Sequence, residues 1–202
     1  MATQGSPAAG VFADDVRAWL IGANGTGGAS VANPIPTAPV SGGAVVGPTN
    51  PMPVAGQAYS ASATFTPAAS AHTAPACNGA AQSIALGAIS ASRIMITSAS
   101  LEIDGATAEV TAWRLYLYSV TPPSALTDTT TFDVPAGDRA SYLGYVDLGT
   151  AVDLGSTQWV ETNIINKQVK LAGTGLFGYL VNLTTLTPAA VAHIVTLHAV
   201  GL

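Results

Sequence analysis

The chain has 202 residues, of which only 8% are charged, and its formal net charge is −5. A typical soluble domain has about 25% charged residues. The six lysines and arginines are scattered, so they do not form the cluster of cations that binding to nucleic acid phosphates requires. An uninterrupted apolar run of about 18 residues, which a transmembrane helix needs, is absent. We therefore expect neither nucleic acid nor a membrane as a partner.

The low charge and the apolar composition indicate a surface that is buried against other subunits of an assembly. The chain is long enough for one domain with its own hydrophobic core. Its first residues do not combine a basic segment with a long apolar one, as a signal peptide does, so we expect synthesis in the cytoplasm.

Residues 1–56 predict an extended N-terminal arm. Prolines at positions 7, 34, 36, 39, 48, 51 and 53 make up seven of the thirteen in the chain and favour polyproline II structure. Within the arm, residues 6–21 predict a short helix, with Ser6 as N-cap. Its apolar face consists of Phe12, Val16, Trp19 and Leu20. Because so short a helix is marginal alone, we predict that these side chains anchor the arm on a partner; a linker without a binding role is the alternative.

From Gln57 onward, apolar and polar residues alternate with the period of two that is typical of strands on a packed sheet. A strand is predicted at residues 57–65. Eight more are predicted at residues 82–87, 92–103, 109–119, 141–148, 157–165, 167–171, 176–184 and 192–200. This pattern predicts an all-β domain over residues 57–202, an eight-stranded, jelly-roll-like antiparallel sandwich. An immunoglobulin-like sandwich is the alternative, but the Cys–Trp–Cys spacing of that fold is absent.

The stretch from Glu109 to Leu148 predicts a strand, a long surface loop and a return strand. Its motifs are Trp113-Arg-Leu-Tyr-Leu-Tyr118, the Pro122-Pro123 turn, Asp128 to Phe132, and Gly137-Asp138-Arg139 to Tyr142-Leu143-Gly144. These motifs resemble those of head decoration (cement) proteins of tailed bacteriophages, which are built on a β-jelly roll. The resemblance covers about Ser83 to the C-terminus.

The resemblance implies a structural protein of the virion that binds the major capsid protein and stabilises the outer surface of the shell. It also implies a homo-oligomer, either a dimer or a trimer. The negative net charge agrees with a place on the capsid exterior, away from the packaged DNA. We accordingly expect no enzymatic activity and no cofactor.

The residues that most often perform chemistry form no recognisable motif. His193 and His198 are five apart on one predicted strand, so they should point to opposite faces and cannot share a metal there. His72 is the third histidine, and we expect all three to be exposed or hydrogen-bonded within the fold. Cys77 is the single cysteine, and no neighbouring basic residue is present to lower the pKa of its thiol.

The long predicted loop contains Asp128, Asp133 and Asp138. Such residues commonly accept hydrogen bonds from their own turn backbone, and this is the interpretation we favour over a calcium site. We therefore predict no metal.

A receptor-binding or carbohydrate-binding sandwich of a phage tail or fibre is the alternative function. It requires an exposed aromatic platform, for which Tyr116, Tyr118 and Tyr145 are the candidates. An enzyme without a recognisable motif is a further alternative.

Overall fold

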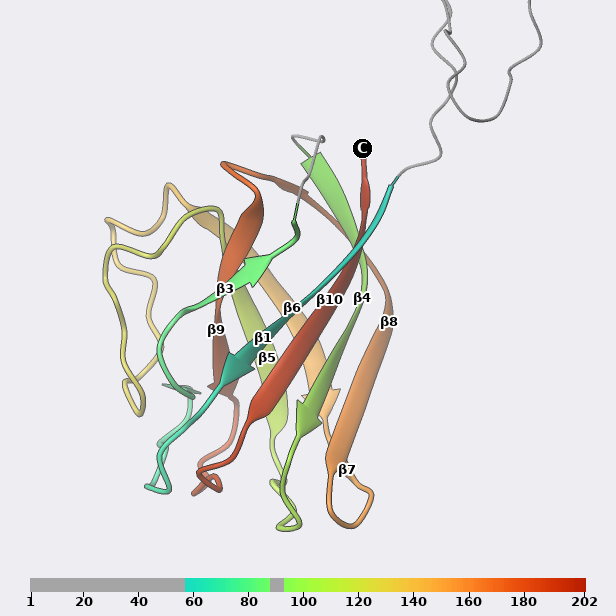
Figure 1. Ribbon diagram of the computed structural model, residues 1–202. Helices are drawn as coiled ribbons and strands as arrows, with labels where there is room; N and C mark the ends of the chain where they lie inside the picture. The colour runs from blue at the N-terminus through green and yellow to red at the C-terminus, as the bar shows by residue number, and fades with distance from the viewer. Residues whose placement is uncertain (1–56, 88–92) are drawn as a thin grey trace, which may run out of the picture. The chain divides into compact units, whose positions relative to one another are not determined.

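The computed structural model describes residues 57–87 and 93–202. All regular secondary structure in these residues is β-strand, as Figure 1 shows. The strands are β1 (Ala58–Phe65), β2 (Ala76–Cys77), β3 (Gln82–Ala85), β4 (Arg93–Ile103), β5 (Ala112–Tyr118), β6 (Tyr142–Thr150), β7 (Val152–Asp153), β8 (Gln158–Lys170), β9 (Gly175–Asn182) and β10 (His193–Gly201). Among these residues no helix is long and apolar enough to cross a membrane. The predicted helix at residues 6–21 lies outside the described residues, as do its proposed anchors Phe12, Val16, Trp19 and Leu20.

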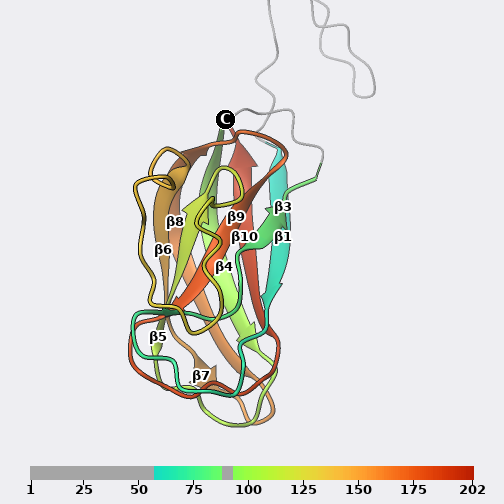
Figure 2. The same cartoon turned by 90° about the vertical axis from the view of Figure 1, so that its left-hand side faces the viewer.

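The strands form two sheets in which every pairing is antiparallel. The first sheet has the order β1-β10-β4-β8-β7. The second has the order β2-β9-β5-β6, and β3 pairs with β9 beside β2. The predicted all-β architecture of antiparallel sheets is therefore confirmed. Figure 2, which views the second sheet from outside, shows the two layers one behind the other.

The pairing is nested along the chain. β1 pairs with β10, β3 with β9, β4 with β8 and β5 with β6. Early strands thus pair with late strands and the middle strands pair with each other, as in one long hairpin. This hairpin is folded over, so that β10 also pairs with β4 and β9 with β5.

The hydrophobic core lies between the facing sides of the two sheets. In β1, exposed and buried residues alternate strictly over all eight positions, because successive side chains point to opposite faces of a strand. Trp113, Leu115 and Leu117 of β5 face the same core as Leu101 and Ile103 of β4. Each fully buried side chain of this size contributes about 1.5–3 kcal/mol relative to an exposed one, so this layer dominates the stability of the domain.

The strand boundaries correct several predictions. The two strands predicted at residues 157–165 and 167–171 are the single strand β8. Its pairing with β4 jumps from Ser98–Asn163 to Ile96–Lys167, so residues 164–166 bulge opposite one residue of β4. Ile164 and Asn166 take positive φ values of 64° and 50°, which interrupts the alternation that the prediction relied on. The described residues form ten strands, whereas an eight-stranded sandwich was predicted. The short strands β2 and β7 were missed because neither has an alternating pattern.

Gly175, the first residue of β9, is required by the close approach of β9 to β3. A Cβ atom on Gly175 would lie 2.5 Å from the carbonyl oxygen of Ile84, whereas one on Gly173 would meet nothing within 4 Å. Gly175→Ala should therefore push β3 away from β9 and lower the free energy of unfolding by about 1–3 kcal/mol. Chemical denaturation checks this, with Gly173→Ala as the matched control. Equal stability of the two variants would contradict the assigned β3–β9 register.

Candidate binding surfaces

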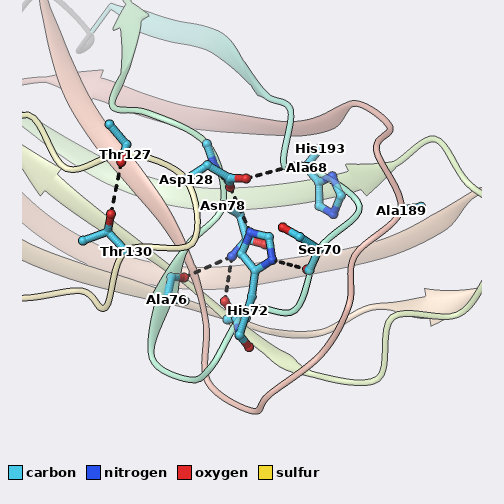
Figure 3. Close-up of polar contacts among 12 residues, drawn as sticks. Ala68, Ser70, His72, Ala76, Asn78, Thr127, Asp128, Thr130, Ala189 and His193 are labelled. Atoms are coloured by element: carbon cyan, nitrogen blue, oxygen red, sulfur yellow. Dashed lines mark hydrogen bonds and ion pairs between the residues drawn. The ribbon is translucent and has the colours of Figure 1, made fainter.

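A buried histidine joins two loops that are distant in sequence. His72 lies in the loop between β1 and β2, and its Nε2 is 2.9 Å from Oδ1 of Asp128, in the loop between β5 and β6. Its Nδ1 is 2.8 Å from the carbonyl oxygen of Ser70. Figure 3 shows the imidazole held between these two partners. The expectation that this histidine is hydrogen-bonded within the fold is confirmed.

Asp128 organises the same junction. Its carboxylate also accepts hydrogen bonds from the backbone N–H groups of Ala68 at 2.8 Å and Gly79 at 2.6 Å. Burial raises the pKa of Asp128, but the hydrogen bonds from His72 and from these two N–H groups outweigh that effect, and the pKa is lowered. The prediction that this aspartate bonds its own turn is wrong, because its partners lie in the β1–β2 and β2–β3 loops.

A second buried histidine–carboxylate pair joins the loop before β5 to the first residue of β10. Nε2 of His193 is 2.8 Å from Oε2 of Glu109, and both side chains are buried. Oε1 of Glu109 accepts the N–H of Ala189 at 2.9 Å. His198 is exposed, so the prediction that it and His193 point to opposite faces is confirmed. The described residues contain no group of three or more His, Cys, Asp or Glu side chains placed to hold a metal ion.

The remaining candidate residues have structural contacts. Asp138 is buried and accepts hydrogen bonds from the N–H and the hydroxyl of Ser124, and exposed Asp133 accepts the N–H of Val134. The Cys77 thiol is fully buried, and burial together with the nearby charge of Asp128 raises its pKa to about 12. A thiol with so high a pKa is a poor nucleophile near neutral pH.

The β5–β6 loop covers part of the outer face of the second sheet, as Figure 2 shows. Under it lies a small apolar cluster that includes Cys77, Tyr118 and Tyr179. Tyr118 is fully buried and meets Tyr179 edge to face, with ring centroids 5.8 Å apart. The expectation that Tyr118 belongs to an exposed platform is therefore wrong. Tyr116 is half-buried under Phe132, and the centroids of the two rings are 3.8 Å apart.

Tyr145 is the one exposed member of the three predicted tyrosines, with 43% of its surface accessible. It borders an open depression of about 430 Å³ between β6 and β8, whose lining also includes Asp147, Thr162 and Lys167. The guanidinium of Arg114 lies 4.0 Å from the centroid of the Tyr145 ring. Aromatic, acidic and basic groups thus meet at this depression, which we name the edge depression.

Arg114 holds this arrangement in place. Its Nε donates to Oδ1 of Asp147 at 2.6 Å, and its Nη1 donates to the hydroxyl of Tyr116 at 3.2 Å. The bond to Tyr116 and the bond to Asp147 raise the pKa of Arg114 further above its already high value. The ammonium of Lys167 lies above Gly144, where an added Cβ atom would come within 2.8 Å of it.

The outer face of the first sheet is the second candidate surface, and Figure 1 shows its strands side by side. Hydroxyl side chains lie at exposed or half-exposed positions of β1, β10 and β4 on this face. They are Ser60, Ser62, Thr64, Ser98 and Thr196. Ser62 and Thr196 lie opposite each other across β1 and β10, with their hydroxyl oxygens 2.8 Å apart. At one end of this face Trp159 is 38% exposed and Val152, its cross-strand partner, is 62% exposed.

Comparison with protein-family models gives no match to this chain, and neither does comparison with curated proteins.

Asp128→Asn is expected to lower the free energy of unfolding at pH 7 by about 1–3 kcal/mol, because hydrogen bonds to a charged group are stronger than those to a neutral one. The pKa of Asp128 is lowered in the folded protein. Its contribution is therefore present above the ordinary carboxyl pKa of about 4 and is lost as the pH falls through the lowered value.

Thermal unfolding of both proteins between pH 7 and pH 2 measures this effect, and the difference between them should shrink on acidification. Asp133→Asn is the control, because Asp133 accepts a hydrogen bond only from its neighbour in the chain. If the difference in thermal stability between the two proteins grew below pH 4, the charged form of Asp128 would not be the source of the stabilisation.

Proposed function

We propose that this chain is a structural protein of a tailed-phage virion, a head decoration or cement protein that binds the outer surface of the capsid shell. The observation that carries the proposal is the nested pairing of β1 with β10, β3 with β9, β4 with β8 and β5 with β6. A long hairpin folded over in this way is the strand order of a jelly roll, the fold that the sequence resemblance implies. A jelly roll over residues 57–202 is therefore part of the proposal.

The chemistry of the described residues supports a binding role over catalysis. Both buried histidines are engaged by carboxylates that also fix loop backbones. The thiol of Cys77 is buried and has a raised pKa. These groups are buried and stabilise loops, whereas catalysis requires an acid, a base or a nucleophile that a substrate can reach. We propose that the protein has no enzymatic activity and no cofactor.

The proposed mechanism is clamping of neighbouring capsid subunits. The domain at residues 57–202 sits on the shell exterior, and the arm at residues 1–56 lies along the major capsid protein. Phe12, Val16, Trp19 and Leu20 anchor the arm. Aromatic anchors of this kind commonly contribute about 2 kcal/mol or more to binding, and prolines reduce the entropy that the arm loses on ordering. Nucleic acid and membranes are not partners in this proposal, and the protein is made in the host cytoplasm.

Co-sedimentation with undecorated shells tests the proposal. The full chain is expected to sediment with the shells at a fixed copy number. A protein of residues 57–202 should be folded but bind poorly, and Trp19→Ala should weaken binding at unchanged thermal stability. Val45→Ala, an apolar change in the arm outside the proposed helix, is the matched control. Full binding by residues 57–202 would show that the arm is not needed for binding. If the full chain did not bind the shells, the proposed function would be wrong.

A receptor- or carbohydrate-binding module of a phage tail or fibre is the second candidate. The edge depression favours it, because Tyr145 offers a ring for stacking while Asp147 and Lys167 offer an acceptor and a donor. Against it, Tyr118 is buried and Tyr116 is stacked under Phe132, which leaves a single exposed ring of the three predicted.

A glycan array distinguishes the two candidate functions. Under the decoration proposal no glycan should bind above background, and Tyr145→Ala should leave shell binding unchanged. Saturable binding of one glycan class that is lost in Tyr145→Ala and kept in Tyr59→Phe, a change outside the depression, would favour the second candidate.

A further inference from the structure

On the outer face of the first sheet, cationic side chains lie at one end of the strands and anionic side chains lie toward the other end. Arg93 and Lys170 lie directly opposite each other at one end of β4 and β8. Toward the other end, Glu102 lies opposite Trp159, and Glu161 lies opposite Ser100. These cationic and anionic residues alternate with the core-facing residues of the same strands, so their side chains belong to the outer face.

The charges at the two ends are unpaired within the described residues. None of the ion pairs found there within 4.0 Å involves Arg93, Lys170, Glu102 or Glu161. Like charges placed directly opposite each other, such as Arg93 and Lys170, destabilise a sheet. A partner that brings anions to this end and cations to the other end would pair the charges at both ends.

We propose that this partner is a second copy of the chain, stacked face to face on the first sheet about a two-fold axis that runs across the strands. An axis across the strands reverses their direction, so the Arg93–Lys170 end of one copy meets the Glu102–Glu161 end of the other. An axis along the strands would instead bring like charges together. Of the two symmetric stackings that keep the strands of both copies aligned, charge therefore selects one, and each opposite-charge contact occurs twice, as in an isologous interface.

The side chains at the centre of the face permit close stacking. Between the charged ends, Ser60, Ser98 and Asn163 form one row with His198 across β1, β10, β4 and β8. Stacked sheets pack about 10 Å apart, which small hydroxyl side chains allow. The contact between Ser62 and Thr196 shows that hydroxyls here can pair with one another. They therefore need not lose hydrogen bonding when water is excluded.

The size of the face predicts a weak dimer. Four long strands spaced about 4.8 Å apart, each presenting about nine residues at 3.3 Å per residue, cover on the order of 600 Å² per copy. This lies at the lower end of specific interfaces, which bury about 800 Å² per partner. Among the described residues, Trp159 is the one large aromatic on the face. The symmetry places it beside the cations of the other copy, where a cation–π contact can form.

Analytical ultracentrifugation of the full chain without capsids tests the inference and does not depend on the proposed function. The expected result is a concentration-dependent monomer–dimer equilibrium. Arg93→Glu/Lys170→Glu makes both ends anionic, and Glu102→Lys/Glu161→Lys makes both ends cationic. Each variant alone should dimerise at least about tenfold more weakly, because like charges then face each other at both ends. Mixed together, the two variants should form a heterodimer.

Asp133→Lys and Arg139→Glu, exposed positions in the β5–β6 loop, are the charge controls and should dimerise like the parent. Circular dichroism of each variant verifies folding. A monomer at every concentration would overturn the inference, as would dimerisation that both charge variants retain or a mixture that fails to associate. If the chain dimerised only after removal of residues 1–56, that segment would be the occupant of the face and the inference would also fail.

Discussion

Burial of alternate side chains between two antiparallel sheets is the constraint on which the rest of the structure depends. Trp113, Leu115 and Leu117 of β5 are fully buried against the first sheet, so the intervening residues must face outward. Those outward positions carry Arg114 and Tyr116, and the equivalent positions of β6 carry Tyr145 and Asp147. The packing of the core therefore also determines which groups are available to a partner.

The two outer faces of the domain differ in how they are covered. The second sheet is partly covered by its own loops, which the His72–Asp128 pair joins to each other. The outer face of the first sheet has no such cover among residues 57–87 and 93–202, and it combines hydroxyl groups with separated charges. A domain with one self-covered face and one open face suits a protein that acts by surface contact.

The period-two alternation predicted the strands well because that signal is local. Most strands, and the opposite faces of His193 and His198, follow from it. The bulge at Ile164 and Asn166 was missed because their positive φ values arise from pairing with β4. The burial of Tyr118 was missed for a similar reason, since the covering loop is a tertiary feature.

The loop contacts had no signal in the sequence. His72 and Asp128 are 56 residues apart, and Glu109 and His193 are 84 residues apart. Only the nested strand pairing brings these side chains together. A lone histidine and a loop aspartate are each compatible with many roles, so neither residue identified its partner.

We propose that this chain binds the exterior of a capsid shell. Cryo-electron microscopy of undecorated shells incubated with the full chain tests it most directly. The account predicts density of the size of the β-domain at symmetry-related positions on the outer surface, with further density running from it along the capsid subunits. Shells that remain bare at saturating protein, or density confined to the tail, would contradict it.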